Sequence, residues 1–244
     1  MPSKFCDIVF VLDASESMRP CIQGLVTNLN QMIRPLQGFE FKVRVGLVAM
    51  SVGVGDGGAP IYRMETLAGD GVDALRAIYS QNQNLLSENT SRFAEKLNSL
   101  SLGGDEDHLL ALDCAFDFPF GPVSTTRRVV ALFSDERIED GMVGPEQLAM
   151  VDALVDKLAA RKIMLFAALP ESPALVQLGC AEGCQIETVA GGNGLSNVNF
   201  SKLLAQMGKT ISVASVQGEE ASYTRALFGQ NEWGAGTGSF DGLR

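Results

Sequence analysis

The sequence predicts an α/β fold with a doubly wound, mostly parallel central sheet, one antiparallel edge strand and helices on both faces. Two observations predict it. Nearly continuous apolar runs alternate with segments of helical periodicity, and a glycine-rich turn separates the second apolar run from a short returning strand. Strands that are apolar on both sides are typical of parallel sheets covered by helices. Short right-handed crossovers then favour the doubly wound arrangement.

The first unit is a strand, a turn and a helix. The apolar run from Ile8 to Leu12 predicts a buried strand. The turn is the segment DASES at positions 13–17. Apolar residues at helical spacing from Cys21 to Leu36 predict the helix that follows.

A second strand and a hairpin come next. Residues 41–52, FKVRVGLVAMSV, alternate at first and then become uniformly apolar, as a strand does on entering a covered sheet. The segment GVGDGGAP has no helix directly after it, so we interpret it as a hairpin loop rather than a phosphate-binding loop. The stretch from Tyr62 to Leu67 is then the antiparallel edge strand. Short helices are predicted at positions 72–79 and 92–100.

Three further strand and helix pairs complete the predicted domain, at 128–133 with 147–160, 163–169 with 174–178, and 185–189 with 200–213. We therefore expect one domain over residues 1–216 and a tail over 217–244, which holds too few apolar residues for another core layer. The tail is interpreted either as a poorly ordered terminus or as a docking segment. Its docking side chains would be Tyr223, Leu227, Phe228 and Trp233.

Composition excludes several classes of function. The 244 residues include 29 acidic and 19 basic ones, giving a net charge of −10 without a basic run, so nucleic acid is not expected as a partner. No apolar stretch reaches the roughly 20 residues that span a bilayer, and the N-terminus lacks the apolar segment of a signal peptide. Five cysteines, an odd number, fit reduced thiols in a cytosol. We expect a cytoplasmic protein that does not act at a membrane.

The turn after the first strand offers oxygen ligands. Asp13, Ser15 and Ser17 would lie beyond the carboxyl end of a parallel strand, where open α/β sheets bind ligands. Carboxylate and hydroxyl oxygens suit a hard divalent cation such as Mg²⁺ or Mn²⁺. The alternative is that Ser15 or Ser17 caps the following helix, because Asp and Ser are common N-caps.

Two later loops offer carboxylates at the same edge of the sheet. The segment GGDEDH at 103–108 presents Asp105 and Glu106 ahead of a helix, whereas Asp107 is expected to serve the start of that helix. The strand ending at Phe133 is followed by Ser134 and Asp135, which repeats the placement of Asp13. Because the carboxyl ends of parallel strands meet at one edge, these acids are expected to converge.

The motifs DASES, GGDE and FSDE, in this order along 5–215, resemble a von Willebrand factor type A domain of the stand-alone cytosolic type, with its metal-ion-dependent adhesion site. The residues that match the family pattern are Asp13, Ser15, Ser17 and Asp135. In most members a Thr stands five residues before the Ala of an Ala-Leu pair. Here Glu106 stands five residues before Ala111, as in integrin β-subunits and related branches, with Asp105 as second choice for this ligand.

The resemblance implies a Rossmann-like fold and a non-enzymatic protein-protein interaction module. Its cofactor would be Mg²⁺, or Mn²⁺ or Ca²⁺, and the ion would hold an Asp or Glu side chain of a partner protein, in a multi-protein assembly in some members. The expected metal ligands are Asp13, Ser15, Ser17, Glu106 and Asp135.

Two alternatives stay open. The same carboxylates would suit a metal-dependent hydrolase, although His108 is the only histidine and no Ser-His or Cys-His pair is evident. A scaffold without metal would use the cluster only for turn hydrogen bonds.

Overall fold

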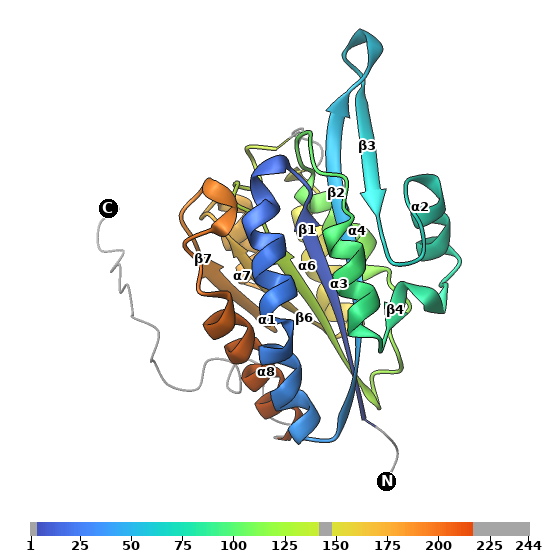
Figure 1. The fold of residues 1–244 in the computed structure, drawn as a ribbon, viewed down its shortest axis with the longest axis vertical. Helices are drawn as coiled ribbons and strands as arrows, with labels where there is room; N and C mark the ends of the chain where they lie inside the picture. The colour runs from blue at the N-terminus through green and yellow to red at the C-terminus, as the bar shows by residue number, and fades with distance from the viewer. Residues whose placement is uncertain (1–3, 142–147, 217–244) are drawn as a thin grey trace.

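The computed structural model describes residues 4–141 and 148–216. Its central sheet has seven strands in the order β3-β2-β1-β5-β6-β7, and β4 pairs with β2 off this path (Figure 1). The strands are β1 (Lys4–Asp13), β2 (Phe41–Val54), β3 (Pro60–Glu65), β4 (Leu86–Ser87), β5 (Thr126–Phe133), β6 (Ile163–Leu169) and β7 (Cys184–Thr188).

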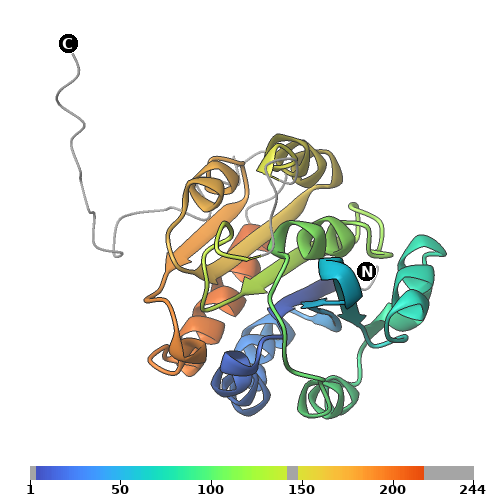
Figure 2. The same ribbon diagram turned by 90° about the horizontal axis from the view of Figure 1, so that it is seen from above.

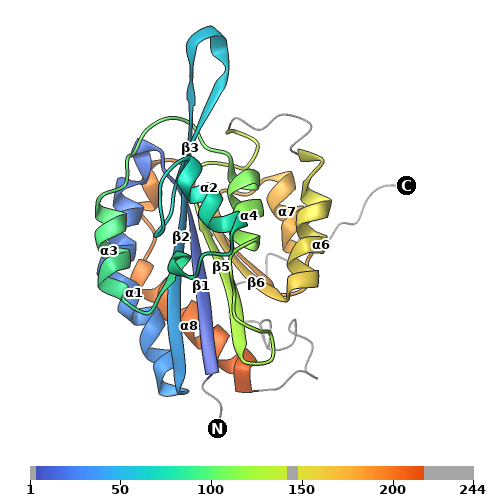
Figure 3. The ribbon, with the colours of Figure 1, turned by 90° about the vertical axis from the view of Figure 1, so that its right-hand side faces the viewer.

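The pairs of β1, β2, β5, β6 and β7 are parallel, whereas β3 and β4 pair antiparallel to β2. The predicted doubly wound, mostly parallel sheet is therefore confirmed, and so is the hairpin that returns as an antiparallel edge strand. Figures 1 and 3 show this hairpin of β2 and β3 projecting beyond the rest of the domain.

Helices cover both faces of the sheet, as predicted (Figure 2). Because side chains alternate along a strand, Ile8, Phe10 and Leu12 of β1 join one core cluster, and Val9 and Val11 join the other. The first cluster includes α1 (Arg19–Gly38), α3 (Thr90–Asn98) and α8 (Phe200–Val216). The second includes α2 (Val72–Tyr79), α4 (His108–Phe116), α6 (Val151–Arg161) and α7 (Pro173–Gly179).

The short strand β4 was not predicted, because two residues within a polar segment give no pattern. It pairs Leu86 with Gly46 and Ser87 with Val45. A Cβ atom at Gly46 would lie 2.9 Å from both the Leu85 carbonyl oxygen and Phe118 Cε1. The missing side chain therefore lets this segment approach β2 closely.

Three further expectations concern the cysteines, a membrane span and the C-terminal tail. All five cysteines are free thiols, and four of them are buried as core residues. No helix within 4–141 and 148–216 is long and apolar enough to cross a membrane. The interpretation of the tail falls on 217–244, which lies outside the described residues.

Candidate metal centre

Four loops meet at the carboxyl edge of the sheet. The first loop (14–18) follows β1, the second (101–107) precedes α4, the third (134–141) follows β5, and the fourth (189–199) follows β7. The parallel register of β1 with β5 brings their ends almost level, pairing Leu12 with Phe133, whereas β2 pairs Met50 with Asp13 and continues to Val54. The predicted convergence of the first and third loops is a direct result of this register.

Asp13 is the last residue of β1 and is only 3% exposed. Its Oδ1 accepts a hydrogen bond from the Ser15 amide at 2.6 Å, and its Oδ2 accepts one from the Ser134 hydroxyl at 3.1 Å. The carboxylate is thereby fixed between the first and third loops. Both donors are neutral, so neither of them balances the charge of the Asp13 carboxylate.

The hydroxyls of the first loop form a chain that ends on Asp135. Ser15 Oγ lies 3.0 Å from Ser17 Oγ, and Ser17 Oγ donates to Asp135 Oδ1 at 3.0 Å. Ser15 occupies the N-cap of the 3₁₀ helix at Glu16–Met18 without a side-chain cap hydrogen bond, and Met18 occupies the N-cap of α1. The capping alternative is therefore wrong for both serines, since their side chains point to each other and to the acid.

Asp135 is also held by the fourth loop, which the sequence interpretation did not include. Its Oδ2 accepts from the Gly194 amide and its carbonyl oxygen from the Gly192 amide, each at 2.7 Å. A Cβ atom at Gly194 would lie 1.8 Å from the Ser17 carbonyl oxygen. Only glycine fits between the first and fourth loops, and the segment GGNG was the available signal.

The second loop is anchored on its neighbours by backbone hydrogen bonds. Asp105 and Val52 exchange two of them, at 2.7 and 2.6 Å, and the Gly103 amide donates to the Ala14 carbonyl at 2.9 Å. Asp107 caps α4 by accepting from the Leu110 amide at 2.9 Å, as expected for an acid at a helix start. The loop thereby directs Glu106 inward, whereas Asp105 is exposed.

Glu106 is 2% exposed and lies near Asp13 and His108. Its Oε1 has no hydrogen-bond partner among the described residues. His108, also buried, begins α4, and burial lowers its pKa to about 4, so the imidazole is neutral at pH 7.

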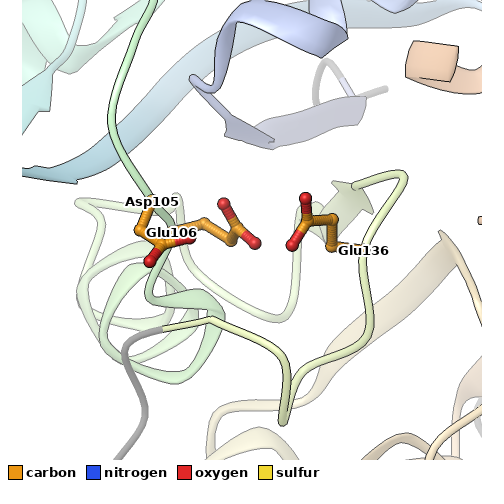
Figure 4. Close-up of side chains that lie close together, drawn as sticks. All are labelled: Asp105, Glu106 and Glu136. Carbon is orange, nitrogen blue, oxygen red and sulfur yellow. The ribbon is translucent and has the colours of Figure 1, made fainter. Parts of the chain in front are cut away.

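The structure adds Glu136, which the sequence interpretation quoted in FSDE without assigning it a role. One carboxylate oxygen from each of Asp105, Glu106 and Glu136 lies within 4.8 Å of the other two. Figure 4 shows the Glu106 and Glu136 carboxylates pointing toward one another. The predicted ligands thus fall into two adjoining groups: a hydrogen-bonded set of Asp13, Ser15, Ser17 and Asp135, and a carboxylate set that contains Glu106.

The electrostatics of these groups favour a cation. Burial raises the pKa of Asp13 to about 6, and the charge of Asp135 adds to the rise, although hydrogen bonds from Ser15 and Ser134 oppose it. Burial also raises the pKa of Glu106 to about 10, helped by a hydrogen bond with Glu136 and by the surrounding acids. None of the ion pairs in the described part of the chain involves these acids. Carboxylate and hydroxyl oxygens lacking a positive partner fit a hard divalent cation.

Comparison with known proteins identifies the fold and nothing finer. Neither a protein-family model nor a curated protein matches the sequence. Among solved structures, the pilus adhesin SpaC from Lactobacillus rhamnosus GG is similar to this chain, with a TM-score of 0.52 and 13% sequence identity. The match covers 87% of this chain and 31% of SpaC, so the chain spans less than a third of that protein. A likeness at this identity is one of fold alone.

Proposed function

We propose that this chain is a von Willebrand factor type A domain that binds a divalent cation at Asp13, Ser15, Ser17 and Asp135, with Glu106 as a further ligand. Through the ion it would hold an acidic side chain of a partner protein, without enzymatic activity. The observation that carries the proposal is the hydrogen-bonded chain from Ser15 through Ser17 to Asp135. It places two hydroxyls and a carboxylate side by side where parallel strands end.

The ligand chemistry supports Mg²⁺, with Mn²⁺ and Ca²⁺ as alternatives. Mg²⁺ keeps some of its waters and is typically bound through a few protein oxygens, so a partner carboxylate can replace a water. Bound there, the ion would supply the positive charge that Asp13 and Asp135 lack. Glu106 would add a negative charge, which should strengthen metal binding and weaken the pull on an incoming acid.

The exposure of the ligands indicates the side from which a partner approaches. Asp13 and Asp135 are buried, whereas Ser17 and its neighbour Glu16 are exposed. The two buried carboxylates would therefore hold the ion from within the domain. Ser17 would lie on its outer side, where an acidic side chain could complete the coordination. A cytoplasmic location within a multi-protein assembly stays part of this proposal.

Calorimetry with Mg²⁺, Mn²⁺ and Ca²⁺ tests the metal site. We expect wild type to bind, and Asp135→Asn to lose binding while keeping its circular dichroism spectrum. Asp56→Asn in the hairpin turn, far along the chain from the ligands, is the matched control and should bind normally. At a free cation concentration about one hundred times Kd, binding stabilises a protein by about 2.7 kcal/mol, which is a rise of roughly 5 to 10 °C in Tm for a domain of this size. Absence of binding by wild type would contradict the proposal.

The partner function needs a separate experiment. Proteins retained from a cell lysate by immobilised wild type in Mg²⁺ should be released by a chelator and should not be retained by Asp135→Asn. Hydrolysis of generic phosphate esters by wild type, lost in Asp135→Asn, would favour the hydrolase alternative instead.

A further inference from the structure

Two of the cysteines lie on either side of the turn between α7 and β7. Cys180 directly follows α7, which ends at Gly179, and Cys184 is the first residue of β7. Cys180 is exposed, whereas Cys184 is only 1% exposed. Because β7 is parallel to β6, this turn lies at the amino edge of the sheet, opposite the candidate metal centre. The pair is therefore independent of the proposed function.

The turn between the two cysteines is tight. The Ala181 amide donates to the Leu178 carbonyl oxygen at 3.1 Å, and the Cys184 amide donates to the Ala181 carbonyl oxygen at 3.3 Å. Gly183 has a φ of 85°, a left-handed conformation that glycine adopts readily. A hydrogen bond that closes a four-residue turn keeps the first and fourth Cα atoms within about 7 Å of each other. Cys180, one residue before Ala181, is therefore held near the start of β7.

The Cys184 side chain faces the helix that ends next to Cys180. It belongs to the core cluster that also contains Leu178 of α7. Ile186, two residues further along β7, shares this side of the strand. A Cβ atom at Gly179 would lie 3.1 Å from Ile186 Cγ1, so the end of α7 packs directly on β7. The exposed thiol and the buried thiol are thus on the same side of the sheet.

The charge interaction between the two thiols agrees with this placement. Burial raises the pKa of the Cys184 thiol to about 12, and a charge on Cys180 adds to the rise. Such an interaction weakens with distance, so the two sulfur atoms lie near each other. The other three cysteines, on β1, α1 and α4, are buried and belong to separate elements. Cys180 and Cys184 are therefore the two cysteines that the fold places together.

Exposure and pKa give the two thiols different roles in an oxidation. The thiolate is the form of cysteine that attacks an oxidant. Cys180 is open to solvent, where a hydroperoxide can reach it. Cys184 is shielded from solvent and stays protonated at pH 7, but Cys180 lies beside it. An accessible cysteine next to a second thiol that resolves its oxidised form is the usual arrangement of a redox-sensitive pair.

We propose that Cys180 and Cys184 are the site of a reversible disulfide that forms when the chain meets a hydroperoxide such as hydrogen peroxide. The Cys180 sulfur attacks a peroxide oxygen, so that an S–O bond forms, the O–O bond breaks and the thiol proton leaves in a molecule of water. The Cys184 sulfur then attacks the resulting sulfenic acid. The S–S bond forms, the S–O bond breaks, and a second water carries away the Cys184 proton. Both thiols are oxidised, the peroxide is reduced, and a thiol reductant reverses the change.

A protease that cleaves after glutamate tests the proposal, because exposed Glu182 lies between the two cysteines. The full chain is treated with hydrogen peroxide, unfolded, alkylated at its remaining thiols and digested. In most molecules of wild type, the fragments on either side of Glu182 should stay joined until a reductant is added. Cys180→Ser and Cys184→Ser should form no link. The matched control Cys114→Ser, which replaces another buried thiol, should form the link as wild type does.

Trapping of the sulfenic acid with dimedone separates a disulfide from simple oxidation of Cys180. Cys184→Ser should be labelled at Cys180 about fivefold more strongly than wild type, because the resolving thiol is absent. Equal labelling of both proteins would overturn the proposal. So would oxidised wild type that carries Cys180 sulfinic acid, or a link to a second copy, in place of the joined fragments. If Cys184→Ser fails to fold, the digest of wild type beside Cys180→Ser decides, since Cys180 is an exposed position.

Discussion

Two aspartates on the same strand have opposite surroundings. Asp7 and Asp13 lie six residues apart on β1, on the same side of the strand, and their exposures are 0% and 3%. Asp7 accepts two hydrogen bonds from the Arg44 guanidinium, at 2.7 and 2.6 Å, and one from the Gly121 amide at 2.8 Å. Asp13 instead accepts hydrogen bonds from neutral groups, among them the Ser15 amide and the Ser134 hydroxyl, and no ion pair within 4–141 and 148–216 includes it.

The difference separates a structural carboxylate from one suited to a ligand. At the amino end of the sheet, the protein supplies the cation, because Arg44 comes from the neighbouring strand β2. At the carboxyl end, several acids converge, and the ion pairs of the described residues leave them without a basic partner. Burial alone therefore does not indicate a metal ligand, whereas burial without a positive partner does.

Replacing Asp7, the carboxylate paired with Arg44, should have the largest effect, which is a loss of folding stability. Asp7→Asn leaves the Arg44 guanidinium, whose side chain is only 19% exposed, without its counter-charge. Loss of one partner of a buried pair costs about 3 to 5 kcal/mol, and the partial exposure of Arg44 favours the lower end. Urea denaturation measures this loss, and cation affinity in calorimetry should stay unchanged. If Asp7→Asn is as stable as wild type, or if it no longer binds metal, the distinction drawn between the two aspartates is wrong.

The second prediction concerns pH in the absence of metal. The folded-state pKa of Asp13 is raised to about 6, so the folded protein keeps a proton that the unfolded chain releases near pH 4. Stability attributable to Asp13 is complete below pH 4 and is lost as the pH rises to about 6, by at most about 3 kcal/mol. Asp13→Asn should therefore be more stable than wild type above pH 6, with the difference vanishing toward pH 4.

The difference between wild type and Asp13→Asn reports Asp13 together with its effect on Glu106, whose pKa the Asp13 charge helps to raise. His108, whose pKa is lowered to about 4, acts in the opposite direction, since its contribution is lost as the pH falls from about 6.5 to 4. Because both proteins contain His108, its contribution cancels in their difference. Urea denaturation at several pH values with a chelator gives the profile, and a difference that does not change with pH would contradict the role assigned to the burial of Asp13.

The smallest effect is expected from replacing Ser134 and concerns cation affinity. The Ser134 hydroxyl donates a hydrogen bond to Asp13 and accepts one from the Glu136 amide. Ser134→Ala removes this support and should weaken cation binding about tenfold, the lower end of the effect of losing a residue that orients a ligand. Ser212→Ala is the matched control, since this buried hydroxyl donates to the Gly208 carbonyl within α8. Equal affinities of the two variants would show that Ser134 does not position Asp13.

Sequence patterns located candidate site residues where these residues directly follow the end of a strand. The apolar runs before Asp13 and Asp135 located the strand ends, and the alternation of strands with helices placed those ends at one edge. Ser134, Glu136 and Gly194 were not assigned, because their roles depend on contacts between loops far apart in the chain. The order of the loops is visible in the sequence, but the side chains that face one another across them are not.

The division of β2 between two antiparallel partners also bears on self-association. Its outer side is covered by β4 at Val45 and Gly46 and by β3 from Ala49 to Val54. The strands left at the two ends of the described sheet, β3 and β7, have only six and five residues, and β3 begins at a proline. Short edge strands and edge prolines discourage another copy from adding its own strand. Eight of the fourteen residues of β2 are thus paired on its outer side, which leaves less of this strand open to edge-to-edge aggregation.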